Sequence, residues 1–197
     1  MGDQGFDITQ GTGTSIHSWS RTVASTSRLD QFFVHGEQPY ATYTAQAVVR
    51  ANTANSHLMF LQGDGTSYVR VRRITVRPAN IASAASTLDI RVYRTSTAGS
   101  SGTAVSARSF DENDGSWGGT IQTLPTSKGT EGNQLLALRL GVPATAPLGT
   151  GVEWTEKERA KPLVFGNGTA NGIAIKNINS MSTEVDVEVE FTLTNFI

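Results

Sequence analysis

The chain has 197 residues, and its 16 lysines and arginines against 17 aspartates and glutamates give a formal net charge of −1. This balance does not favour a nucleic-acid partner, which calls for a basic excess or a basic stripe. The absence of cysteine excludes disulfides, cysteine-ligated zinc and thiol catalysis, and without a long apolar run or a visible signal peptide we expect no membrane partner and no ordinary export.

Residues 1–40 differ in composition from the rest of the chain. They are rich in Gly, Ser, Thr and Gln, and no hydrophobic period of 2 or 3.6 is sustained. Isolated large apolar residues occur among them, whereas a purely disordered tail would be poorer in aromatics. We predict an extended N-terminal arm that becomes ordered by docking on its own body or on a neighbour. The alternatives are an irregular first strand of the same domain and, for residues 27–33, a turn of helix. The arm residues that we expect to anchor it are Phe6, Ile16, Trp19, Phe32 and Phe33.

Residues 41–197 are predicted to form one β-domain. Clusters of Gly, Asn and Pro recur every 10 to 20 residues, and such clusters mark turns between strands. Regular strand spacing without helical periodicity predicts an all-β fold, an antiparallel β-sandwich of jelly-roll type. The predicted strands are residues 42–50, 57–62, 68–77, 87–95, 104–110, 120–124, 134–140, 152–155, 162–165, 172–177 and 183–194.

The last of these strands has the most regular pattern in the chain. Its residues alternate between apolar and acidic or polar, which is typical of a strand with one buried and one solvated face. The predicted buried face carries Val185, Val187, Val189, Phe191 and Leu193, and the solvated face carries Glu184, Asp186, Glu188, Glu190 and Thr192.

The predicted strand at 68–77 is basic, and its alternation slips at one point. Val69 and Val71 share one parity, whereas Ile74 and Val76 share the other. One additional residue that reverses the faces is the signature of a β-bulge, here between Arg72 and Arg73. Opposite charges on neighbouring strands stabilise a sheet, so we expect the arginines of this strand to pair with the acidic strand, within one sheet or across a subunit boundary; a nucleic-acid-binding stripe is the alternative. The predicted pairing set is Arg70, Arg72, Arg73 and Arg77 with Glu184, Asp186, Glu188 and Glu190.

No local pattern predicts catalysis. His17, His35 and His57 lie in different segments without a metal-ligand spacing, and no G-x-S-x-G elbow is present. We therefore predict no enzyme, no catalytic residues and no cofactor. The segment 111–115 begins like a calcium loop, but position 122 is Gln122 where a bidentate glutamate would be needed, so an acidic turn is the simpler interpretation and no metal site is predicted.

Trp117 stands among glycines and serines at a predicted loop tip. Two interpretations are open: an exposed contact for a sugar ring or a protein partner, or a side chain that folds back over one end of the sandwich. For Trp154, in a short strand flanked by charges, packing in the core or at a sheet edge is expected.

Three segments together resemble a known group of proteins. They are the strand at 87–95 (TLDIRVYRT), the VRRI sequence at 71–74 that precedes it, and the closing EVDVEVEF sequence at 184–191. Across residues 65–195 the chain resembles small β-sandwich virion proteins of tailed bacteriophages, in particular head decoration or cement proteins.

The resemblance implies a protein that binds the outer surface of the head and reinforces junctions between capsomers. Its partner would be the major capsid protein or another virion protein, it would form a homo-oligomer, in this group often a trimer, and it would be located in the virion after assembly in the bacterial cytoplasm. The alternative is a carbohydrate- or receptor-binding module of a phage tail or fibre, for which Trp117 is the expected contact.

Overall fold

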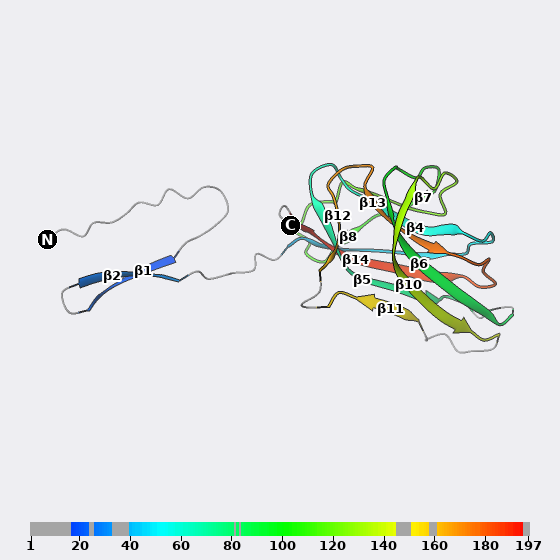
Figure 1. Cartoon of the computed structure of the whole chain (residues 1–197), viewed down its shortest axis with the longest axis horizontal. Coiled ribbons are helices and arrows are strands. Elements are labelled where there is room, and N and C mark those ends of the chain that lie inside the picture. The colour runs from blue at the N-terminus through cyan, green and yellow to red at the C-terminus, as the bar shows by residue number, and fades with distance from the viewer. Residues whose placement is uncertain are drawn as a thin grey trace. The chain divides into compact units, whose positions relative to one another are not determined.

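The computed structural model describes residues 17–23, 26–32, 40–80, 82, 84–144, 151–157 and 161–194. The chain divides into two compact units, Met1–Pro39 and Tyr40–Ile197, and both are drawn in Figure 1. Every regular element among the described residues is a β-strand. No helix among them is long and apolar enough to cross a membrane.

The first unit contains a two-stranded antiparallel hairpin. β1 (His17–Val23) pairs with β2 (Thr26–Phe32), and the register places Trp19 opposite Asp30. The helical turn considered for residues 27–33 is therefore wrong, because residues up to Phe32 belong to a strand. The predicted anchors Phe6, Ile16 and Phe33 lie outside the described residues, and the docking of the arm stays a prediction.

The second unit consists of two antiparallel sheets. In the first sheet the strand order is β10-β6-β13-β4-β9-β7, and in the second it is β11-β5-β14-β3-β8, with β12 paired to β5 as well. The strands are β3 (Thr42–Val49), β4 (Ser56–Gln62), β5 (Tyr68–Pro78), β6 (Ser86–Thr95), β7 (Thr103–Ala104), β8 (Arg108–Ser109), β9 (Thr120–Thr123), β10 (Glu131–Val142), β11 (Val152–Thr155), β12 (Leu163–Phe165), β13 (Gly172–Asn177) and β14 (Val185–Thr194).

The connections between the strands follow jelly-roll order. The chain passes from one sheet to the other between β3 and β4, between β4 and β5, and between β5 and β6. The late strands then insert between the early ones, since β13 lies between β4 and β6, and β14 lies between β3 and β5 (Figure 1). This arrangement of two sheets joined by Greek-key connections is the jelly roll. The predicted all-β sandwich is confirmed.

One predicted strand is wrong. Residues 104–110 do not form a single element, because β7 pairs with β9 in the first sheet and β8 pairs with β3 in the second. The segment between them, 105–107, crosses the edge of the sandwich. Its alternating apolar residues, Val105 and Ala107, pack against the core during this crossing, which explains why the pattern looks like that of a strand.

The core lies between the two sheets and is apolar. The alternation in β14 places Val185, Val187, Val189 and Phe191 inside with no solvent exposure, while Leu193 is half-buried. The facing sheet contributes the fully buried Ile90, Val92, Ile173 and Ile175, among others. Burial of side chains of this size contributes about 1.5–3 kcal/mol each, so β14 holds the two sheets together.

Candidate functional site

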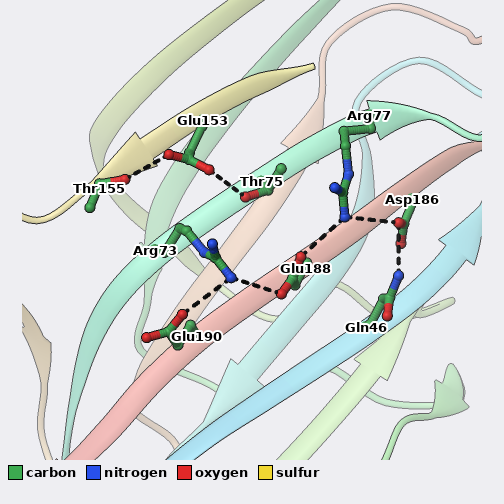
Figure 2. A network of polar contacts seen from close by, with 9 residues as sticks. All are labelled: Gln46, Arg73, Thr75, Arg77, Glu153, Thr155, Asp186, Glu188 and Glu190. Atoms are coloured by element: carbon green, nitrogen blue, oxygen red, sulfur yellow. Dashed lines mark hydrogen bonds and ion pairs between the residues drawn. The ribbon is translucent and has the colours of Figure 1, made fainter. Parts of the chain in front are cut away.

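The candidate site is the solvated side of the second sheet, where β5 and β14 are neighbours. Since the valines of β14 turn inward, its carboxylates turn outward beside the arginines of β5 (Figure 2). We call the set Arg73, Arg77, Asp186, Glu188 and Glu190 the charged face. The two strands thus meet within one sheet, so no subunit boundary is needed to pair them.

A β-bulge shapes this face. Glu190 is opposite Arg73 and Phe191 is opposite Val71, so Arg72 is the additional residue. The slip in the sequence pattern predicted a bulge here, and the register confirms it. As a result Arg72 and Arg73 both point to solvent, while Val71 and Ile74 on either side remain fully buried. The bulge therefore places two consecutive arginines on the solvent-exposed face of the sheet and leaves the core closed.

Two arginines and three carboxylates form one continuous network. Arg73 Nη2 lies 3.1 Å from Glu188 Oε1 and 3.2 Å from Glu190 Oε2. Arg77 Nη2 lies 3.2 Å from Glu188 Oε2 and 3.4 Å from Asp186 Oδ2. Glu188 thus bridges both guanidinium groups (Figure 2).

The neighbouring strands add polar contacts on both sides of this network. Gln46 on β3 donates from Nε2 to Asp186 Oδ2 at 2.8 Å. On the opposite side Thr75 donates to Glu153 Oε2 at 3.3 Å, and Thr155 donates to Glu153 Oε1 at 2.9 Å (Figure 2). The network around Glu188 thus spans β3, β14 and β5, and a separate group of contacts joins β5 to β11.

The carboxylates of the charged face are less exposed than its arginines. Asp186, Glu188 and Glu190 are 16%, 19% and 26% exposed, whereas Arg73 and Arg77 are 36% and 44% exposed. An ion pair at this level of exposure contributes about 0–1 kcal/mol, and a network with shared partners contributes more than isolated pairs do. The arrangement suits a preformed docking surface of mixed charge, because most of its groups are already oriented by their neighbours.

Three residues of the predicted pairing set have other partners. Arg70 and Arg72 both bind Glu156, each at 2.8 Å, and Glu184 accepts a hydrogen bond from Asn80. The reason lies in the register, which places Thr192 rather than a carboxylate opposite Arg70. Glu156, which is only 7% exposed, was missed because it follows β11 and is far from β14 in the sequence.

A second polar cluster lies on the first sheet and was not predicted. His57 Nε2 on β4 is 2.8 Å from Glu131 Oε1, and Lys176 Nζ on β13 is 2.8 Å from Glu131 Oε2. Lys176 Nζ also lies 5.1 Å from the centre of the Tyr93 ring, a cation–π contact. His57 has no solvent exposure, and its Nδ1 atom has no hydrogen-bond partner among the described residues. No local signal could have found this cluster, because its members come from four different strands.

Burial and hydrogen bonding shift two pKa values in this cluster. Burial lowers the pKa of His57 below its ordinary value, although the hydrogen bond to Glu131 opposes that shift. For Glu131, burial alone would raise the pKa, but the hydrogen bonds from Lys176 and His57 outweigh it and lower the pKa. A neutral imidazole that donates from Nε2 to an ionised Glu131 fits both directions.

The buried histidine predicts that stability depends on pH. In the unfolded chain His57 titrates near its ordinary pKa of about 6.5, and in the folded protein it titrates lower. The unfolded state then binds more protons as the pH falls through 6.5, so the free energy of unfolding decreases. We expect this loss to be at most about 1.4 kcal/mol between pH 7.5 and pH 5.5, the limit set by protonation of His57 in the unfolded chain, and urea unfolding of the whole chain measures it. His57→Gln should flatten this part of the profile, and an unchanged pH dependence in this variant would contradict the assignment.

The structure resolves the two interpretations of Trp117. Its side chain is only 8% exposed and packs on Phe191, with ring centroids 4.7 Å apart. Gly119 allows this, since a Cβ atom there would lie 2.1 Å from the indole ring. Trp117 therefore covers the core, and the predicted surface contact for a sugar or partner is wrong. Trp154 is half-buried in the edge strand β11, as expected for sheet-edge packing.

The acidic loop is organised by its own hydrogen bonds. Asp111 Oδ1 accepts from the backbone N–H and the side-chain amide of Asn113 at 2.9 and 2.8 Å, and Asp114 accepts from Ser109. Within the part of the chain that the structure describes, no three His, Asp or Glu side chains are grouped as metal ligands.

An open groove lies at the end of the sandwich, between β6, β10 and the β12–β13 loop. Its volume is about 470 Å³, and Arg94 at its rim donates from Nη1 to the carbonyl oxygen of Val164 at 2.8 Å. We call it the end groove; it is lined by Arg94, Thr95, Ser96, Gly132, Asn133, Phe165, Gly166, Asn171 and Gly172. Its accessible polar groups are amides, hydroxyls and one guanidinium, a set that hydrogen-bonds neutral or anionic oxygen-rich ligands.

Comparison with protein-family models, with curated proteins and with solved structures finds no match to this chain.

Proposed function

We propose that this chain is a non-enzymatic structural protein of a tailed-bacteriophage virion, which binds the outer surface of the head and stabilises capsomer junctions. The observation that carries the proposal is the division into a jelly-roll body and a separate N-terminal unit. The two-stranded hairpin described in that unit is marginally stable in water without further packing. A partner surface is the natural source of that packing.

In this proposal the major capsid protein, or another virion protein, binds the N-terminal unit. Trp19 on β1 and Phe32 on β2 belong to the expected anchors, together with Phe6, Ile16 and Phe33. Large aromatic side chains are the residues that most often dominate the energy of a protein interface. The charged face then offers a second, polar contact area, because its groups are preordered and keep their partners in the free protein.

Removal of residues 1–39 tests the proposal. We expect the truncated chain to keep its strand signal in circular dichroism, since the body has its own core, and to lose at least tenfold in affinity for empty heads in co-sedimentation. Trp19→Ala with Phe32→Ala should weaken binding in the same direction. Phe110→Ala is the matched control, because this aromatic residue is 63% exposed on the body and not in the arm. Undiminished sedimentation of the truncated chain with heads would overturn the proposal.

The end groove supports a second candidate function, a carbohydrate- or receptor-binding module of a tail or fibre. Its polar lining suits a saccharide, but Phe165 is only 1% exposed and so provides no stacking platform for a sugar ring. Binding of the wild type on a glycan array that Asn171→Ala abolishes would favour this function over head decoration. A blank array for the wild type would exclude it for the glycans tested.

A further inference from the structure

Among the described strands, β10 lies at the edge of the first sheet. It has twelve residues, and among the described residues its backbone pairs with β6 alone. After two register shifts near its start, the pairing with β6 is regular from Leu136 to Val142. A long, regular edge strand presents a row of backbone donors and acceptors that can pair with another strand.

The core reaches the surface along this edge. Leu136, Leu138 and Leu140 share the inward side of β10, opposite Val92, Ile90 and Leu88 of β6. The three β6 residues are fully buried or nearly so, but the three leucines are only partly buried. On the second sheet, Val152 and Trp154 of β11 are partly buried as well. An apolar row at a free sheet edge loses its remaining exposure when the sheet is continued.

The devices that usually protect an edge strand are weak here. Between Leu136 and Val142 there is no proline, and Arg139 is the one charged residue. Its Nε atom lies 3.5 Å from Asp89 Oδ2 within the same sheet, so its charge is already partly compensated. Natural edges that must stay unpaired carry inward charges, prolines or bulges along their length.

We propose that β10 pairs with β10 of a second copy of this chain, antiparallel and around a two-fold axis at Leu138. In this register Leu136 is opposite Leu140 of the second copy, and Leu138 is opposite its own equivalent. All three leucines of each copy then meet leucines on the inward side, and on the outward side Ala137 is opposite Arg139 of the second copy.

Two neighbouring registers are less favourable. An axis at Arg139 places two like charges directly opposite each other, which destabilises a sheet. A shift by one residue brings inward residues opposite outward residues, so the leucine row of one copy faces solvent. The Leu138 register is self-complementary, as a two-fold interface requires. It yields a dimer through a continuous sheet and is distinct from the trimer that the resemblance implies.

This inference goes beyond the proposed function, because it concerns the free body and needs no capsid. The wild type should sediment as a dimer at tens of micromolar. Ala137→Lys places two lysines opposite the two Arg139 side chains and should shift the protein to monomer, whereas Ala137→Glu should tighten the dimer. Val48→Lys and Val48→Glu are matched controls at a 57% exposed strand position of the other sheet, and neither should change the mass.

The lack of cysteine allows a second test of the register. In Leu138→Cys the two thiols are on directly opposite residues, whose Cα atoms are about 4.5–5.5 Å apart, so mild oxidation should give a covalent dimer. In Leu136→Cys the two equivalent positions are roughly 13 Å apart, which is too far for a disulfide. A monomeric wild type, a dimer that Ala137→Lys does not weaken, or equal cross-linking at 136 and 138 would each overturn the proposal.

Discussion

Trp117→Ala is expected to lower the free energy of unfolding by about 3–5 kcal/mol, the usual loss when a buried tryptophan or phenylalanine is truncated to alanine. The side chain covers Phe191, which is fully buried and also stacks on Tyr43 at 5.6 Å. Its removal opens a cavity at that end of the core. The rigid sheets on either side limit how far the cavity can close. The effect is measured as the shift of the urea midpoint at constant m value.

A more conservative variant separates packing from polarity. The Nε1 atom of Trp117 is buried without a hydrogen-bond partner among the described residues, and an unsatisfied buried donor costs about 1–3 kcal/mol. Trp117→Phe removes this donor but keeps an aromatic ring against Phe191. Its free energy of unfolding should therefore fall much less than that of Trp117→Ala. Phe110→Ala replaces a side chain that is 63% exposed, so it should change the free energy of unfolding by no more than about 0.5 kcal/mol. If Trp117→Ala is as mild as Phe110→Ala, the indole does not cover the core in solution.

Glu188→Lys is expected to destabilise the protein by about 1–3 kcal/mol. Glu188 is the one carboxylate of the charged face that contacts both Arg73 and Arg77. The substitution removes two ion pairs and places a third cation between two guanidinium groups, and each lost or repulsive contact contributes about 0.2–1 kcal/mol. Thermal and urea unfolding at low ionic strength measure the loss.

Salt and a neighbouring residue provide the controls for this effect. The cost of Glu188→Lys should shrink in 1 M salt, where the screening length is about 3 Å. Glu184→Lys makes the same change of charge at the residue before β14. Glu184 accepts a hydrogen bond from the Asn80 amide rather than from an arginine, so this variant should lower the free energy of unfolding less than Glu188→Lys does. Equal losses for the two variants, unaffected by salt, would show that the network does not stabilise the sheet.

Much of the fold follows from alternation in the sequence. The strands at 152–155 and 172–177 have the predicted bounds, and the parity slip at Arg72 and Arg73 located the bulge. These features are local, because each depends only on which face of a single strand is buried. The error at residues 104–110 is of the same origin, since a segment that crosses the sandwich edge also alternates between buried and exposed residues.

The candidate site was only partly accessible to such reasoning. Sequence placed arginines and carboxylates on two strands, but the choice of partners depends on register. The register places Arg73 and Arg77 beside carboxylates of β14, whereas Arg70 and Arg72 form ion pairs with Glu156. The pairing of His57 with Glu131 had no signal at all, because it joins β4 to β10 through the topology of the first sheet. The glycines around Trp117 likewise do not indicate whether its side chain turns to solvent or to the core.

The central positions of β13 and β14 have a consequence for biosynthesis. Each sheet has a gap in its middle until these two strands are made, since β13 joins β4 to β6 and β14 joins β3 to β5. A nascent chain that has been translated only as far as β12 therefore holds four strands with unpaired inner edges. Contacts that span most of the sequence slow folding and expose such edges to aggregation. The ribosome must release nearly the whole body before either sheet can close, so chaperones that shield nascent β-strands should matter more for this protein than for one built from local hairpins.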